Sequence, residues 1–212
     1  MFNHKSTTKN FAIVLLAAGQ SSRLGQMKQL LPIQNKKLIT VQLEMALKVT
    51  DKVYCVLGYQ AKEIHDHIDH LPITTIINST WSEGMASSIA RGVDALAPDT
   101  QAVMIILVDQ WQLTSADLTR HLAYWQEAPD AIVVAQNESV MTENAKEKIG
   151  PPVIFPQHYF AELKQLTGQQ GAKPLLKKYQ DKLLKVALGH AFIDLDTPEQ
   201  LTQMNKILGV KP

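Results

Sequence analysis

Short apolar runs alternate with segments of helical periodicity along most of the chain. This alternation is typical of βαβ units built around a parallel sheet. The run Phe11–Leu16 contains no polar residue, which indicates a strand buried on both faces. The other long apolar runs predict strands at residues 52–57, 73–77, 102–108, 131–135, 185–188 and 192–195. The run at residues 153–155 lies between prolines, which cannot donate a ladder hydrogen bond, so we predict an edge or isolated strand there.

The segments between these strands show the spacing of helices. Periodicity predicts helices at residues 37–49, 59–70, 85–96, 157–166 and 174–179, and one that begins after Ser115 as its N-cap. The last helix begins at Thr197, because Pro198 and Gln200 complete the pattern of a capping box. Residues 1–10 are predicted to be a flexible leader, and residues 136–148 an exposed loop or flap. The expected fold is a single doubly wound α/β domain at residues 11–212, with a mostly parallel sheet and helices on both faces.

Composition narrows the classes of function. The 212 residues are 45% hydrophobic and 19% charged, as in a globular protein. A net charge of +1 gives no overall field that would attract nucleic acid or an anionic membrane, so we expect neither as a partner. The single cysteine, Cys55, lies in an apolar run and is expected to be a buried small hydrophobe. No apolar segment has the length of a signal peptide or a membrane span, so we expect a cytoplasmic protein.

The loop after the first strand carries the sharpest chemical signal. Its small residues allow backbone amides to approach a phosphate closely, and Arg23 and Lys28 add positive charge. The loop leaves the carboxyl end of a strand, where ligands bind in open α/β sheets. Its spacing matches neither the P-loop nor the dinucleotide fingerprint. The sequence therefore predicts a phosphate-binding loop of another class, formed by Leu16, Ala17, Ala18, Gly19, Gln20, Ser21, Ser22, Arg23, Leu24 and Gly25.

Carboxylates follow two of the predicted strands. Asp109 ends the strand at residues 102–108, and Asp194 and Asp196 end the strand at residues 192–195. Because the carboxyl ends of parallel strands meet at one edge, these acids are expected to face one crevice, where Mg²⁺ is held by one or two carboxylates and substrate phosphates. Asp109 and Asp196 are the predicted metal ligands, and Asp194 is either a ligand or a supporting group.

Six fragments of the chain, in order, resemble the MobA-like nucleotidyltransferases, and most closely their molybdenum cofactor cytidylyltransferase branch. The fragments lie at residues 16–32, 78–92, 107–110, 150–155, 166–173 and 194–199. The resemblance implies the nucleotide-diphospho-sugar transferase type of doubly wound sheet. It also implies transfer of CMP from CTP to the molybdopterin cofactor, with Mg²⁺ and release of pyrophosphate. A molybdenum hydroxylase, or the chaperone of its maturation, is the protein partner that this chemistry suggests.

The resemblance assigns roles to residues of this chain. Arg23, Lys28 and Asp109 are the expected catalytic residues, and Asp109 and Asp196 the expected Mg²⁺ ligands. The nucleotide is expected to bind to Leu16, Ala17, Ala18, Gly19, Ser21, Ser22, Arg23, Gly25, Lys28, Asn78, Gly84 and Ser87. Ala18 stands where guanylyl-transferring relatives usually carry glycine, which favours a cytosine pocket.

Two positions depart from the family pattern, and both concern the acceptor. Trp111 replaces the proline that usually follows Asp-Gln, and it either covers the acceptor site or packs under the next helix. Gln169 replaces the aspartate of a Gly-Asp-x-Gly motif. Two alternatives therefore stay open: a sugar phosphate or other phosphorylated acceptor, and a non-catalytic nucleotide- or cofactor-binding accessory protein. The histidines of residues 65–70 are interpreted as solvated helix surface, because no cysteine joins them.

Overall fold

The structure is a computed structural model, and it describes residues 10–33, 35–137 and 148–209. Within these residues, seven strands form one sheet in the order β5-β4-β1-β6-β8-β7-β9, and β2 and β3 form a small separate hairpin. The strands are β1 (Phe11–Leu16), β2 (Pro32–Ile33), β3 (Lys36–Lys37), β4 (Val53–Leu57), β5 (Thr74–Ile77), β6 (Ala102–Leu107), β7 (Ile132–Gln136), β8 (Ile149–Pro156) and β9 (Leu183–Ala187). The predicted leader at residues 1–9 and most of the predicted flap, residues 138–147, lie outside the described residues.

The centre of the sheet is parallel, as the sequence predicts. Strand β1 pairs in parallel with β4 on one side and with β6 on the other, and β4 pairs in parallel with β5. All six residues of β1 are buried, which is why this strand shows no polar alternation. The carboxyl ends of β1, β4, β5 and β6 therefore meet at one edge of the sheet, and the loops that follow them lie together.

The expectation of an edge or isolated strand at residues 153–155 is wrong. Strand β8 lies inside the sheet and pairs antiparallel with both β6 and β7. Its prolines are tolerated because of where they fall in the ladder. Pro151 and Pro152 lie opposite a register shift between Val134 and Ala135, and Pro156 is the last residue of the strand. At neither place does a regular ladder require the missing N–H.

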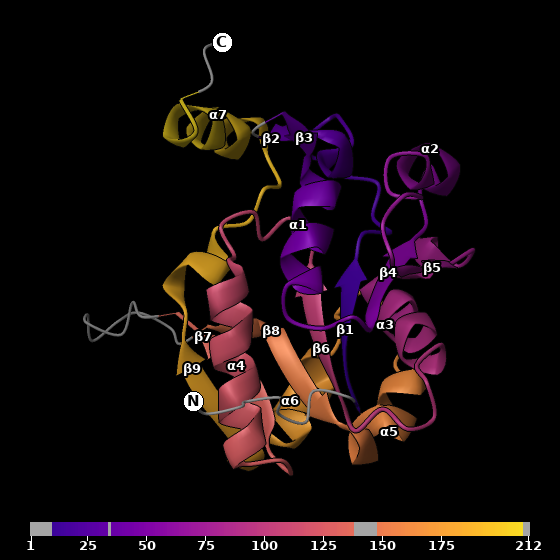
Figure 1. Cartoon of the computed structure of the whole chain (residues 1–212), viewed down its shortest axis with the longest axis vertical. Helices are drawn as coiled ribbons and strands as arrows, with labels where there is room; N and C mark the ends of the chain where they lie inside the picture. The colour runs from indigo at the N-terminus through magenta and orange to yellow at the C-terminus, as the bar shows by residue number, and fades with distance from the viewer. Residues whose placement is uncertain (1–9, 34, 138–147, 210–212) are drawn as a thin grey trace, which may run out of the picture.

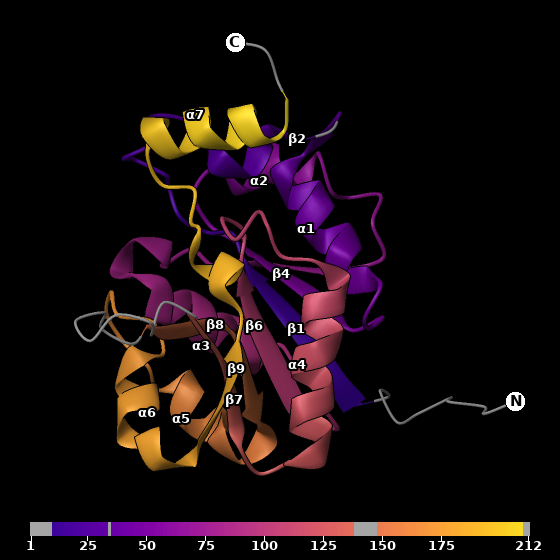
Figure 2. The same ribbon diagram turned by 90° about the vertical axis from the view of Figure 1, so that its left-hand side faces the viewer.

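Helices cover both faces of this sheet, as predicted. They are α1 (Leu38–Leu47), α2 (Ala61–His65), α3 (Met85–Asp94), α4 (Ser115–Glu127), α5 (Phe160–Lys164), α6 (Lys173–Lys178) and α7 (Pro198–Ile207), with short 3₁₀ turns η2 (Lys28–Leu30), η3 (Trp81–Glu83), η4 (Gln157–Tyr159), η5 (Gln180–Lys182) and η6 (Gly189–Phe192). Helices α1 and α4 pack on one face, and α3, α5 and α6 on the other (Figure 1; Figure 2). Helix α7 lies beyond the carboxyl ends of the central strands (Figure 1), and its Met204 is buried in the core on the α1 side. None of the described helices is long and apolar enough to cross a membrane.

Three further sequence predictions need correction. Residues 192–195 form no strand: a 3₁₀ turn and irregular chain follow β9, and the apolar Ala191 and Leu195 instead fill the core. The predicted helix at residues 59–70 shortens to α2, after which the chain continues in turns. The N-cap of α4 is Thr114 rather than Ser115, because Thr114 and Asp117 form the reciprocal capping box. The box of Thr197 and Gln200 at the start of α7 is confirmed.

His121 on α4 generates a prediction about stability. The side chain is fully buried, and burial together with the nearby Arg120 charge lowers the pKa of His121 to about 4. The unfolded chain therefore binds a proton between about pH 6.5 and pH 4 that the folded chain excludes, so this contribution to stability is lost as the pH falls through that window. From pH 7 to pH 5, we expect wild type to lose about 2 kcal/mol more unfolding free energy than His121→Leu.

Urea denaturation at the two pH values measures this difference. His67→Gln is the matched control, because that side chain is exposed on the surface. An identical loss of stability in wild type and His121→Leu would contradict the assignment.

Candidate active site

The loop between β1 and η2 is held in shape by a buried amide side chain. Gln29 is buried, and its Nε2 donates hydrogen bonds of 2.8 Å to the carbonyl oxygens of both Ala17 and Gly19. Two residues of the loop, Ser21 and Gly25, adopt positive φ values of 57° and 75°, which turn the chain back toward η2. The loop is therefore a fixed concave backbone rather than a loose glycine-rich turn.

Backbone amides of this loop remain available for a ligand. Within the described part of the chain, the amides of Gly19, Gln20, Ser21 and Ser22 donate no hydrogen bond to another residue. Successive free amides in a turn form a concavity that binds anions. The arrangement suits a polyphosphate lying along the loop.

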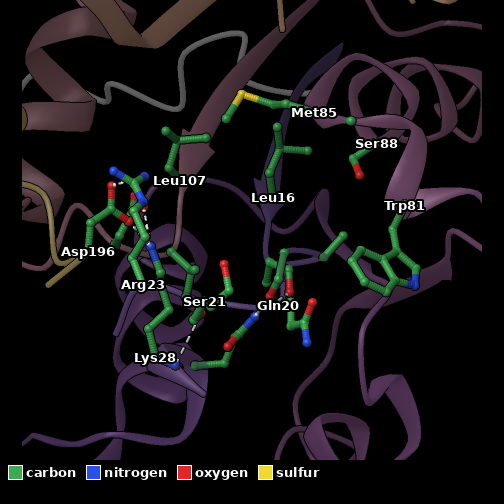
Figure 3. Close-up of a pocket in the computed structure, with 18 of the residues that line it drawn as sticks. Leu16, Gln20, Ser21, Arg23, Lys28, Trp81, Met85, Ser88, Leu107 and Asp196 are labelled. Atoms are coloured by element: carbon green, nitrogen blue, oxygen red, sulfur yellow. Dashed lines mark hydrogen bonds and ion pairs between the residues drawn. The ribbon is translucent and has the colours of Figure 1, made fainter. Parts of the chain in front are cut away.

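A cluster of opposite charges lies beside the loop. The Lys28 ammonium is 2.8 Å from Asp109 Oδ2 and 2.5 Å from Asp196 Oδ1, and Lys28 is only 8% exposed. Arg23 Nη2 contacts the other oxygen of Asp196 at 3.0 Å, from a side chain that is largely exposed. The structure thus brings together the four charged residues that the sequence assigns to the site, from three distant parts of the chain. Figure 3 shows Arg23, Lys28 and Asp196 at this end of the pocket.

The electrostatics of the cluster are dominated by its carboxylates. Burial by itself lowers the pKa of Lys28, but the charges and hydrogen bonds of Asp109 and Asp196 outweigh it and raise that pKa above the ordinary value. Burial, together with the negative charges of Asp109 and Asp196, raises the pKa of the neighbouring Asp194 to about 6. Burial is the larger cause of this second shift, and the two neighbouring carboxylates add to it.

Asp109 and Asp196 fit the role of metal ligands. The Oδ1 atom of Asp109 is buried and has no hydrogen-bond partner among the described residues. Such an orphaned carboxylate oxygen is costly unless a cation or a donor satisfies it. The described residues form no cage of three or more His, Cys, Asp or Glu side chains. Mg²⁺ needs no such cage, because it is usually bound by one or two carboxylates and substrate phosphates.

The loop and the charge cluster open into a pocket of about 430 Å³. Its charged end is formed by Arg23, Lys28 and Asp196, and its opposite end by Trp81 and Ser88, with Leu16 between them (Figure 3). The lining residues are Leu16, Ala17, Ala18, Gly19, Gln20, Ser21, Ser22, Arg23, Lys28, Gln29, Trp81, Ser82, Gly84, Met85, Ser88, Leu107, Val108, Asp109, Gln169 and Asp196. The pocket is therefore elongated, with ionic groups at one end and an aromatic wall at the other.

Trp81 forms this aromatic wall. Its side chain packs on Gly58, where an added Cβ would lie 2.5 Å from the Trp81 Cβ and 2.8 Å from the Ala18 carbonyl oxygen. The Tyr59 ring supports the indole edge-to-face, with 5.6 Å between ring centroids. Trp81 thus contacts both the core and the pocket.

Three of the predicted nucleotide-binding residues do not line the pocket: Gly25, Asn78 and Ser87. Asn78 is buried behind the wall, and its Nδ2 donates to Ser87 Oγ at 2.9 Å and to Ser88 Oγ at 3.0 Å. Asn78 thereby orients Ser88, which does line the pocket. Its contact with a nucleotide is indirect in this geometry.

The segment with the departing Gln169 lies against the amino end of α3. Gly84 has a φ of 120°, and an added Cβ would lie 2.4 Å from the Gly168 carbonyl oxygen. The same oxygen accepts a hydrogen bond of 3.2 Å from the Ala86 amide. Gln169 consequently lines the pocket, whereas Trp111 packs against the core on the α1 side and is not part of the lining.

Comparison with known proteins identifies the family. A family model described as the MobA-like NTP transferase domain matches residues 13–183. The chain belongs to this family. Three curated relatives match most of the chain. Nicotine blue oxidoreductase of Paenarthrobacter nicotinovorans is 30% identical over 90% of this chain and 94% of that protein, and Purine catabolism protein PucB of Bacillus subtilis is 28% identical over 92% of this chain and 96% of that protein. Molybdenum cofactor cytidylyltransferase of Escherichia coli is 22% identical over 88% of this chain and 91% of that protein.

Solved structures show the same fold. Rv0371c from Mycobacterium tuberculosis superposes with a TM-score of 0.80 at 24% identity, covering 94% of this chain and 100% of that one. A complex of the same protein with manganese gives a TM-score of 0.75 at 22% identity, covering 93% of this chain and 98% of that one. The fold is therefore that of the nucleotide-diphospho-sugar transferases, and the chain is a nucleotidyltransferase of the MobA-like family.

The close packing at Gly84 gives a testable prediction. Gly84→Ala should lower the unfolding free energy by roughly 1–3 kcal/mol, because alanine strains the positive φ, and its Cβ would also collide with the Gly168 carbonyl. Urea denaturation measures the loss. Gly19→Ala is the control and should lose much less, because its added Cβ meets nothing within 4 Å. Equal losses in the two variants would contradict the packing.

Proposed function

We propose that this protein is a Mg²⁺-dependent cytidylyltransferase that transfers CMP from CTP to the molybdopterin cofactor bearing molybdenum. An oxygen of the acceptor phosphate attacks the α-phosphorus of CTP, the bond to the β-phosphate breaks, and pyrophosphate leaves. The observation that carries the proposal is the Lys28–Asp109–Asp196 cluster at one end of an amide-lined pocket.

The shape of the pocket supports one orientation of the nucleotide. The free amides of the loop and the cations of Arg23 and Lys28 suit the triphosphate. The base then lies toward Trp81, where an aromatic face can stack on it. Ala18 also lines the pocket, and its methyl group would leave less room for a bicyclic purine than glycine would.

Asp109 and Asp196 would hold the metal ion. The orphaned Oδ1 of Asp109 supports this assignment. The Asp109 and Asp196 carboxylates also lie close together, since both contact the Lys28 ammonium. A bound Mg²⁺ supplies positive charge for the triphosphate and polarises its phosphoryl oxygens. The manganese complex of a protein with the same fold is consistent with a divalent ion.

The chain's own residues then do little covalent work. The acceptor phosphate is already an anionic nucleophile, so the site needs positioning and charge neutralisation more than a general base. Lys28 is positioned between Asp109 and Asp196, where its ammonium can stabilise charge that develops on the leaving pyrophosphate. Arg23 can follow the departing group outward, because its side chain is largely exposed.

The acceptor is the part of the proposal that Gln169 most directly concerns. The neutral Gln169 lines the pocket where the family pattern has an acid. This observation favours a second candidate, transfer to a sugar phosphate or other phosphorylated acceptor. The relative from Escherichia coli is named for molybdenum cofactor chemistry, which supports the first candidate.

One assay separates these alternatives. Purified protein is incubated with CTP, Mg²⁺ and either molybdopterin cofactor or a panel of sugar phosphates, and pyrophosphate release is measured. Release with the cofactor supports the first candidate, and release only with another acceptor supports the second. Absence of release with every acceptor would favour a nucleotide-binding accessory protein instead.

Substitutions in the charge cluster test the catalytic assignment. Lys28→Met and Asp109→Asn should each lower kcat/KM for pyrophosphate release by about 10²–10³-fold, the scale seen when one transition-state donor is lost. Lys36→Met is the matched control, because it removes an exposed ion pair with Glu44 outside the pocket. Full activity of either cluster variant would contradict the assigned roles.

A thermal-shift measurement tests the base. With Mg²⁺, CTP should raise the melting temperature more than GTP does, because tighter binding to the folded state gives greater stabilisation. Ala18→Gly should increase the shift produced by GTP, since it removes the methyl group from the pocket wall. Equal shifts by both nucleotides in wild type would argue against a cytosine pocket.

A further inference from the structure

Gln110 is a buried amide that follows Asp109 directly but does not line the pocket. It is 1% exposed. Its Oε1 accepts a hydrogen bond of 3.1 Å from the Leu107 amide, and its Nε2 donates to the carbonyl oxygens of Pro151 at 2.7 Å and Ala191 at 2.8 Å. Both hydrogens of the side-chain amide are therefore used, each by a different segment of the chain.

The first of these contacts fixes the turn that carries Asp109. Pairing between β6 and β8 ends at Ile105 and Val153, so the Leu107 amide has no ladder partner on that side. Gln110 Oε1 accepts the hydrogen bond that a carbonyl oxygen of a neighbouring strand would otherwise accept from this amide. The backbone N–H of Gln110 also donates to the Leu107 carbonyl oxygen at 3.3 Å. Two hydrogen bonds between Leu107 and Gln110 therefore close the turn, and Asp109 lies inside it.

The contact with Ala191 fixes the segment that carries Asp196. This segment belongs to no strand, so no ladder sets its distance from β6. Gln110 holds its beginning at Ala191, and the Gln200 side chain holds its end by accepting a hydrogen bond of 2.7 Å from the Asp196 amide. Buried Leu195 packs between these two anchors.

From these contacts we infer that Gln110 is a positioning residue that sets the separation of the Asp109 and Asp196 carboxylates, and thereby the affinity of the site for a divalent cation. The inference rests on the proposed function, in which those two carboxylates hold the metal. Gln110 itself touches neither metal nor substrate. Groups that orient metal ligands from behind typically change metal affinity or activity by about 10–100-fold when they are replaced.

The test compares two variants with a matched control. Gln110→Met keeps the length of the side chain and loses all three hydrogen bonds, and Gln110→Glu keeps the acceptor oxygen and loses the donated ones. Thr50→Val is the control, because buried Thr50 also bonds a backbone carbonyl, that of Phe11 at 3.0 Å, at the opposite end of β1. All three variants should lose stability in thermal unfolding.

Mn²⁺ affinity is the readout that a purely structural role would not move. Free Mn²⁺ is titrated with each full-length protein and followed by electron paramagnetic resonance. We expect the Mn²⁺ dissociation constant to rise at least about tenfold in both Gln110 variants and to stay near the wild-type value in Thr50→Val. In turnover assays at fixed metal, kcat should fall in the Gln110 variants while KM for CTP changes little.

The outcomes distinguish this inference from the proposed function. Wild-type Mn²⁺ affinity in Gln110→Met or Gln110→Glu overturns the inference, even if the enzyme transfers CMP as proposed. Loss of affinity in Thr50→Val equal to that in the Gln110 variants overturns it as well, since general destabilisation would then explain the effect. Both Gln110 variants could fail to fold, and Gln200→Leu then serves as the test, because it removes the hydrogen bond to the Asp196 amide. We expect weaker Mn²⁺ binding in Gln200→Leu, and an unchanged affinity in this variant overturns the inference. Weaker Mn²⁺ binding without any transfer of CMP supports the inference and contradicts the proposed reaction.

Discussion

The site depends on the ion pairs that the buried Lys28 ammonium makes with Asp109 and Asp196. This ammonium connects the loop after β1 with Asp109, 81 residues later, and with Asp196, 168 residues later. Without a cation at that position, two carboxylates would face each other at a poorly hydrated edge of the sheet, and leaving one buried charge unpaired is costly. The ion cluster therefore connects three of the segments that line the pocket, which no single strand pairing does.

The topology of the sheet explains why these segments meet. Strand β1 lies between β4 and β6, so the loop after β1 and the turn after β6 leave the same edge side by side. Asp196 comes from a different route. The chain passes from β9 at the far edge of the sheet through an irregular segment toward α7, and is held by hydrogen bonds from side chains rather than by a ladder. The site thus combines a half set by parallel strands with a half set by the side-chain amides of Gln110 and Gln200.

The sequence was informative where one local property decides the structure. An apolar run without alternation predicted β1 correctly, and the order of residues at the start of α7 predicted its capping box. The sequence-based predictions failed where the structure depends on the position of a residue in the hydrogen-bond ladder of the sheet. The prolines of β8 would indicate an edge strand only if every ladder position needed an N–H. Pro151 and Pro152 are the extra residues of a bulge in β8, where no such N–H is needed. The apolar residues near 192–195 pack in the core without forming a strand. Hydrophobic periodicity does not distinguish such residues from those of a paired strand.

The site shows the same division. Residue type and placement after predicted strands were enough to nominate Arg23, Lys28, Asp109 and Asp196, which the structure brings together. The strand predicted before Asp196 does not form, and this residue reaches the site from an irregular segment. The residues that hold them in place, Gln29 and Gln110, are buried neutral amides. Both lie in fragments that resemble the family, but neither fragment indicates that these side chains are buried. Such side chains act by bonding to carbonyl oxygens of distant segments, and sequence spacing contains no information about those partners. A nucleotidyltransferase site is therefore easier to find from its charges than to explain from them, because the separation of its carboxylates also depends on residues that carry no charge.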